Sequence, residues 1–149
     1  TFAVDFSGYD AWRDMEYPGE TDPAVIGFSA APFGQALPNG FRYYLGNGEN
    51  DAAILTLSGQ TGADWVYRHP RVEPARSDVG ASYEWSTDLE HWQDGGESRG
   101  GVTVDFTTSA GAPDASGIVS VEVRATPSGA PVDRLFVRLK LVFPFVATP

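Results

Sequence analysis

Aromatic side chains carry the chemistry that stands out most in this sequence. The chain contains 4 Trp, 6 Tyr and 9 Phe, so aromatic residues make up 13% of it. The flat faces of Trp and Tyr can stack on the C–H faces of sugar rings, and the same shape makes them anchors at binding surfaces in general. Five of these residues are our candidates for contacting a ligand: Trp65, Trp85, Tyr67, Tyr43 and Trp92.

The alternative for each candidate is that its ring fills a hydrophobic core. Trp85 shares a predicted strand face with Tyr83, and Trp65 shares one with Tyr67, because residues two positions apart point the same way in a strand. A central-strand Trp is often buried in a β-sandwich, and burial is the commoner fate of Trp. A sugar-binding platform and a core both stay open for these side chains.

Nucleophilic catalysis needs a nucleophile, a histidine base and a carboxylate that converge in space. The chain has two histidines, His69 and His91, and no G-x-S-x-G motif accompanies them. His69 precedes a proline at a predicted strand end, and His91 lies between Glu90 and Trp92 in an expected surface turn. We therefore expect both imidazoles to be solvated.

Glycoside hydrolysis needs two carboxyl groups about 5–10 Å apart. Glu84, Glu90, Glu97 and Glu122 could supply such a pair, but any acidic domain of this size offers such candidates by chance. Glu84 and Glu122 fall on the polar faces of predicted strands, where we expect them to be solvated or paired with Arg124 or Arg138. We therefore predict that the chain is not an enzyme and has no catalytic residues.

Metal-binding patterns are weak as well. The absence of cysteine and of any H-x-x-x-H motif excludes a typical zinc site. Asp88, Glu90 and Asp94 could hold a calcium ion in a loop, but the glycine-centred ligand spacing of calcium loops is missing. We expect no metal and no cofactor, and a structural calcium ion stays open as an alternative that no motif supports.

Length, charge and hydropathy exclude several classes of partner. The chain has 149 residues, 42% of them apolar, which suits one globular domain over residues 1–149. Its 20 acidic and 10 basic residues give a net charge of −10, which argues against binding to the phosphate backbone of a nucleic acid. No run of about 18 apolar residues occurs, so we expect no membrane span.

Residues 1–50 predict a lead-in with two short helices. Ser7 can cap a helix over Tyr9–Glu16, and a second helix is expected over Pro38–Leu45. Residues 18–36 hold three Pro and three Gly without a clear period, so we expect a loop there.

Residues 51–149 change to a period of two, which predicts strands. The predicted strands are Ala52–Ser58, Asp64–Arg68, Ser82–Ser86, Val102–Thr107, Val119–Arg124 and Leu135–Phe143. Such alternating strands joined by short turns predict a mainly β fold, an antiparallel β-sandwich of the immunoglobulin/fibronectin type. We expect the lead-in to pack on this sandwich within the same domain.

Two groups of motifs resemble a known family. The first group has Trp12 near an acidic segment, then Asp22-Pro23, Gly27, Leu37-Pro38-Asn39 and Arg42-Tyr43-Tyr44-Leu45-Gly46. The second has Glu84-Trp85-Ser86-Thr87-Asp88-Leu89-Glu90-His91-Trp92, followed by Arg134-Leu135-Phe136-Val137-Arg138-Leu139. In this order, over nearly the whole chain, they resemble the C-terminal β-sandwich modules of large secreted multidomain proteins of Verrucomicrobia and related bacteria.

The resemblance implies an extracellular or cell-envelope location and a non-catalytic accessory role. Members usually carry an Asp-rich, calcium-binding stretch before the Leu-Pro-Asn segment. Ala31, Phe33 and Gln35 stand at those positions here, which argues against a calcium site.

We therefore predict a non-catalytic accessory module of a secreted multidomain protein that binds polysaccharide through exposed aromatic rings. Its partners would be a polysaccharide or oligosaccharide and the other domains of its parent protein. One alternative is a C-terminal sorting or assembly domain, which the apolar final strand Leu135–Phe143 favours. The other is a structural spacer.

Overall fold

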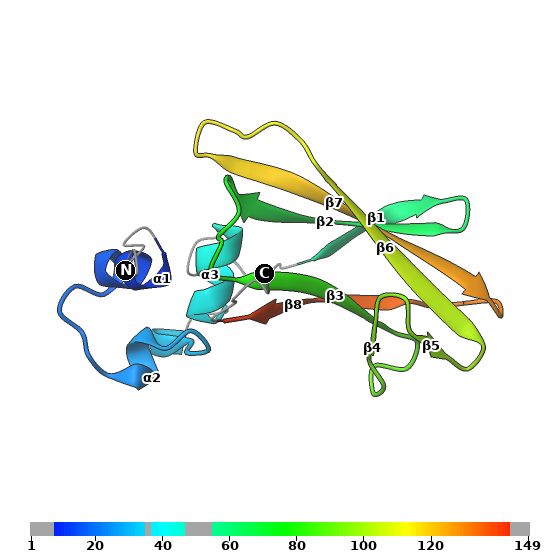
Figure 1. Ribbon diagram of the computed structural model, residues 1–149, viewed down its shortest axis with the longest axis horizontal. Coiled ribbons are helices and arrows are strands. Elements are labelled where there is room, and N and C mark those ends of the chain that lie inside the picture. The colour runs from blue at the N-terminus through cyan, green and yellow to red at the C-terminus, as the bar shows by residue number, and fades with distance from the viewer. Residues whose placement is uncertain (1–7, 35–36, 47–54, 144–149) are drawn as a thin grey trace, which may run out of the picture.

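Two antiparallel β-sheets lie face to face, and short helices gather at one end of them (Figure 1). The structure is a computed structural model, and it describes residues 8–34, 37–46 and 55–143. The prediction of a mainly β, antiparallel sandwich is confirmed.

The larger sheet has five strands in the order β1-β2-β7-β6-β5. They span β1 Thr56–Thr61, β2 Asp64–Val72, β7 Ile118–Gly129, β6 Val102–Ala110 and β5 Ser98–Arg99. Along β7, Val119, Val121 and Val123 are buried, whereas Glu122 and Arg124 lie on the outer face. β-Branched side chains suit this half-buried, pleated position, and β7 pairs with β2 on one side and β6 on the other.

The smaller sheet has three strands in the order β4-β3-β8, which span Gln93–Asp94, Gly80–Ser86 and Phe136–Val142. The predicted strands over 82–86 and 135–143 agree with β3 and β8 to within two residues at each end. The predicted strand over 52–58 is described from Leu55 onward and lies further along the chain, as β1. The two-residue strands β4 and β5 are too short to show a period, so the pattern does not predict them.

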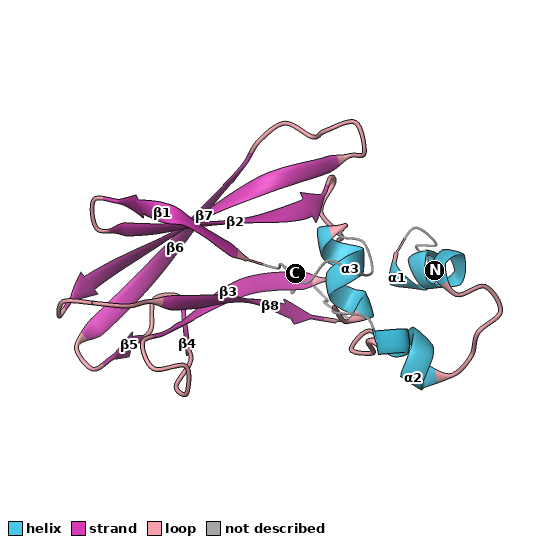
Figure 2. Ribbon diagram, turned by 180° about the vertical axis from the view of Figure 1, so that it is seen from behind, coloured by secondary structure: helices cyan, strands magenta, loops and turns pink. Residues whose placement is uncertain are grey.

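The strand pairing follows that of an immunoglobulin sandwich (Figure 2). β2 pairs with β7, β7 pairs with β6, and β3 pairs with β8, as strands B and E, E and D, and C and F do in that fold. Among the described residues, no strand takes the place of strand G beside β8. On this side the small sheet therefore ends one strand earlier than the large sheet that faces it.

Helices α1 Tyr9–Glu16, α2 Pro23–Ile26 and α3 Asn39–Leu45 and the 3-10 turn η1 Pro32–Gly34 form the lead-in. The core has two clusters of buried side chains. The first lies between the sheets and includes Tyr67, Trp85 and Val123. The second joins the lead-in to the sandwich, with Tyr9, Tyr44 and Leu45 packed alongside Val79 and Leu139. Helix α3 ends at Gly46, whose φ of 81° lies in the left-handed region that favours glycine.

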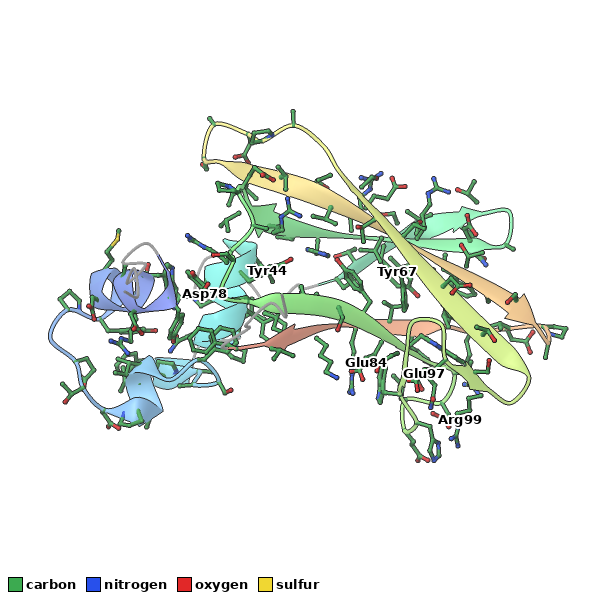
Figure 3. All side chains as sticks on the ribbon, in the orientation of Figure 1. Tyr44, Tyr67, Asp78, Glu84, Glu97 and Arg99 are labelled. Atoms are coloured by element: carbon green, nitrogen blue, oxygen red, sulfur yellow. The ribbon has the colours of Figure 1, made fainter. Side chains whose placement is uncertain are left out.

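Asp78, in the loop before β3, binds the start of α1. One of its oxygens accepts a hydrogen bond from the Tyr9 backbone N–H at 2.9 Å, and the other accepts one from the Tyr43 hydroxyl at 2.8 Å. A carboxylate at this position also interacts favourably with the helix dipole. Ser7, the predicted cap, lies outside the described residues, and Asp78 ties two helices to the sandwich (Figure 3).

The expectation of a loop over residues 18–36 is wrong in part, because α2 and η1 lie there. The Asp22 side chain caps α2, and the buried Asn39 donates hydrogen bonds from Nδ2 to the carbonyls of Val25 and Gly27 at 2.7 and 3.0 Å. A four-residue helix shows no helical period in the sequence, and much of its support comes from a distant residue.

Candidate functional site

Three of the five candidate aromatic residues lie in the core. Trp85 and Tyr43 are each 1% exposed, and Tyr67 is 6% exposed. Rings buried to this extent cannot stack on a glycan, so the prediction that these three side chains contact a ligand is wrong.

Internal hydrogen bonds explain how these polar aromatic side chains are buried. The Tyr67 hydroxyl lies between the sheets and donates to the Leu135 carbonyl at 2.8 Å (Figure 3). Burial raises the pKa of Tyr67 to about 12, so its hydroxyl stays protonated. Trp85 occupies the inner face of β3, at the place of the buried Trp of strand C in immunoglobulin domains, and its Nε1–H donates to the Asp94 carbonyl.

Trp65, the fourth candidate, is half-buried and packs against the same core cluster. It lies opposite Ala125 on β7 and Gln60 on β1, so its ring belongs to the inner face of the large sheet. Trp65 therefore lies at the border between the core and the surface and does not form a flat outer platform.

Trp92, the fifth candidate, lies on the outer side of the small sheet. The Arg138 guanidinium lies over its ring, 4.1 Å from the ring centroid, and Arg138 Nε donates to Glu84 Oε1 at 2.8 Å. Glu84 and Arg138 are direct cross-strand neighbours on β3 and β8. This part of the small sheet presents a half-buried indole held beside charged hydrogen-bonding groups.

Strand β8 has a free edge among the described residues. Every residue from Phe136 to Val142 is in register with a residue of β3, from Ser86 to Gly80, so one edge of β8 is fully paired. No described strand pairs with the opposite edge. An unpaired edge presents a row of backbone N–H and C=O groups that another strand can bind.

Leu57 on β1 is an inward-facing residue that no described strand of the small sheet covers. Leu57 lies directly across from Tyr67, so both side chains point to the inner face of the sheet. Tyr67 is 6% exposed, whereas Leu57 is 50% exposed, and all six residues of β1 are exposed. Within the described residues the facing sheet ends at β8, and this inward-facing leucine is exposed.

The expectation that His69 is solvated is wrong, because its side chain is 2% exposed. His69 Nε2 lies 2.6 Å from the Tyr83 hydroxyl, and Nδ1 lies 2.8 Å from the Pro70 carbonyl oxygen. A carbonyl only accepts, so Nδ1 carries the proton and Nε2 accepts from the Tyr83 hydroxyl. Burial lowers the pKa of His69 and raises that of Tyr83, which keeps both groups neutral.

Asp88, Glu90 and His91 place three potential metal-ligating atoms within 4.8 Å of one another, and all three residues are exposed. The Asp88 carboxylate already accepts hydrogen bonds from the backbone of Glu90 and from the backbone and ring of His91. These bonds, with those from His91 the strongest, hold the pKa of Asp88 well below its usual range. Asp94 is not part of this group, which has the geometry of a capped turn.

Of the four carboxylates considered for glycoside chemistry, the two on strand faces are paired as expected. Glu84 binds Arg138, and Glu122 binds Arg124 through Nε at 2.8 Å. Glu84 lies on the outer face of the small sheet and Glu122 on the outer face of the large sheet. The two carboxylates therefore do not face each other across one site.

No family model, no curated protein and no solved structure matches this chain. Among residues 8–34, 37–46 and 55–143, no helix is long and apolar enough to cross a membrane.

Sequence reasoning missed the residues around the free edge, chiefly Leu57 and Lys140. The available signal was the charge pattern of the last predicted strand, which carries the single lysine of the chain, Lys140, on its polar face.

Proposed function

We propose that this chain is a non-catalytic interaction module that accepts an extended strand of another polypeptide at the free edge of β8. Strand addition of this kind takes its affinity from main-chain hydrogen bonds and its specificity from alternate side chains. The observation that carries the proposal is Leu57, which faces inward and is 50% exposed opposite that edge. A strand added beside β8 would cover it.

This role is that of an assembly domain, one of the alternatives that the final apolar strand favours. In the proposal the module belongs to a secreted multidomain protein and joins that protein to a partner. Support for the wider setting comes from the family resemblance of the motifs.

Fluorescent labelling at Leu57 tests the proposal directly. The sequence has no cysteine, so a Leu57→Cys variant can be labelled at one site with an environment-sensitive dye. Addition of a seven-residue peptide that alternates valine and threonine is expected to shift the dye emission to the blue. Leu89→Cys is the matched control, because Leu89 is 57% exposed on the loop after β3, and its dye should not respond.

The competing result would be an unchanged Leu57 dye up to millimolar peptide, together with slow hydrogen exchange, before any peptide is added, at the β8 amides that point away from β3. That result would mean that another part of the same chain already covers the edge, and the proposal would be wrong.

A glycan is the second candidate ligand, because Trp92 is held on the outer face beside Arg138 and Glu84. A shallow site with one ring should bind with a Kd of roughly 10 µM to 1 mM. Affinity electrophoresis against a panel of polysaccharides, with Trp92→Ala compared with Trp65→Ala, tests it. Retardation that Trp92→Ala alone abolishes would support a glycan site, and equal mobility in every gel would count against one.

A further inference from the structure

We infer that the strand accepted by β8 carries an acidic residue opposite Lys140 and comes from a partner other than a second copy of β8. This inference rests on the proposed function and specifies the chemistry of the partner.

The charges on β8 lie on its outer face. Arg138 and Lys140 alternate with Val137, Leu139 and Leu141, which point toward the core clusters. Arg138 lies across from Glu84 and is paired with it, whereas Lys140 lies across from Ser82. Lys140 therefore has no carboxylate opposite it on β3.

A strand on the free edge would place one residue directly across from Lys140. Directly opposed residues of an antiparallel pair have Cβ atoms about 4.5–5.5 Å apart, close enough for a carboxylate to pair with an ammonium group. On the inner face, the same strand would present apolar side chains to Leu57. The expected partner strand thus alternates apolar residues with polar ones that include Asp or Glu.

Self-pairing of β8 is disfavoured by the same charges. In a two-fold antiparallel pairing, the central registers place Arg138 against Arg138, Arg138 against Lys140, or Lys140 against Lys140. Like charges directly opposite each other destabilise a strand pair, and lysine on an edge strand is a common protection against self-association.

The net charge of −10 opposes the approach of an acidic partner at long range. At physiological salt, however, interactions beyond about 8 Å are largely screened, whereas a cross-strand pair lies within that distance. The local charge of β8 therefore decides which strand is preferred.

The test compares three peptides on ¹⁵N-labelled protein by NMR. One alternates valine with threonine, and in the other two the central threonine is replaced by aspartate or by lysine. We expect shifts at β8 amides, with the aspartate peptide binding about two- to fivefold more tightly than the neutral one and the lysine peptide more weakly. Lys140→Glu should reverse that order.

Arg134→Glu is the matched control, because Arg134 is an exposed cation that precedes β8, and the substitution changes the net charge equally. It should leave the order of the peptides unchanged. An equal change in both variants would mean that overall charge, and not Lys140, sets the preference, and would overturn the inference.

The outcomes separate the two proposals. Equal affinity for all three peptides, with shifts at β8, would overturn the acidic preference and leave the proposed function standing. Absence of β8 shifts with every peptide would overturn the proposed function itself. Dimerisation of the unmodified protein in analytical ultracentrifugation, lost in Leu57→Asp, would show that a second copy is the occupant and would overturn the inference.

Discussion

His69 on β2 and Tyr83 on β3 share a 2.6 Å hydrogen bond that joins the two sheets through the interior. The Pro70 carbonyl fixes the imidazole tautomer by accepting from Nδ1, and Phe106 packs beside the Tyr83 ring at a centroid distance of 5.7 Å. The bond thus links a residue of the large sheet to one of the small sheet by a polar contact within a largely apolar layer. The hydrogen bond requires a neutral imidazole, because Nε2 accepts the Tyr83 proton only when it carries none itself.

Stability should fall as the pH is lowered from about 7.5 to 5. Burial lowers the pKa of His69 below the ordinary value of 6.5, so below that value the unfolded chain binds a proton that the folded chain does not. The stabilisation that depends on neutral His69 is complete above pH 6.5 and is lost as the pH falls toward the folded-state pKa. Over that range the free energy of unfolding falls by at most about 1.4 kcal/mol per pH unit.

Thermal unfolding measured across this pH range checks the expectation. His69→Gln should flatten the dependence, whereas His91→Gln, a change at the exposed histidine, should leave it in place. An unchanged slope in His69→Gln would assign the pH dependence to other groups.

Tyr83→Phe should destabilise the fold by about 1–3 kcal/mol, because it leaves the buried Nε2 of His69 without its donor. The ring contact with Phe106 is kept, so the loss reports the hydroxyl alone. Chemical denaturation of Tyr83→Phe, His69→Phe and the double variant gives the coupling energy, expected at about 0.5–3 kcal/mol. Additive single effects would mean that the bond contributes little.

The period-two pattern predicted most of the long strands, because each long strand has one buried and one solvated face. The prediction that His69 is solvated was wrong, because the proline that follows it suggested that the strand ends there. β2 in fact continues past Pro70 to Val72, while β1 pairs with β2 only as far as Arg68. Among the described residues no strand pairs with β2 at Pro70 on the β1 side, and proline, which lacks an N–H, is tolerated at such strand positions.

The candidate site could not be predicted from the sequence, because it depends on the order in which the strands pair. Local sequence patterns do not contain that order. Trp85 and Trp92 are the same residue type, so hydrophobicity does not distinguish them. Trp85 nevertheless lies on the inner face of a central strand, whereas Trp92 lies against Arg138 on the outer side of the sheet. Among the described residues β8 has a free edge because β3 pairs with it on one side alone. Such long-range facts follow from the register and cannot be read from neighbouring residues.

Trp85→Ala should cost about 3–5 kcal/mol of unfolding free energy, the range for a large aromatic side chain removed from a core. Trp92→Ala should cost less, because the ring is only half-buried and its cation–π contact with Arg138 contributes about 0.5–1 kcal/mol. Urea denaturation followed by circular dichroism measures both without relying on the altered fluorophore. Similar losses in the two variants would contradict the assignment of Trp92 to the surface.

Asp78→Ala should loosen the helical lead-in before the sandwich unfolds. The carboxylate binds both the first N–H of α1 and the Tyr43 hydroxyl, and loss of a helix cap alone costs about 0.5–2 kcal/mol. Hydrogen exchange at the α1 amides should quicken while the β7 amides stay protected. Asp78→Asn, which keeps an acceptor oxygen, should have a smaller effect, and uniform exchange across both regions would rule out a separate loosening.

Leu57→Asp should leave the fold nearly intact and remove strand binding. Leu57 is half-exposed on β1, so the substitution creates no cavity, and a change of at most about 1 kcal/mol is expected for a strand residue at the surface. An added strand beside β8 would bury the new carboxylate against apolar side chains, which opposes binding. Thermal unfolding and the peptide titration on β8 measure the two effects separately. Thr56→Asp, which lies across from Arg68 on the outer face of the same strand, is the control for charge, and strand binding retained in Leu57→Asp would place the bound strand away from β1.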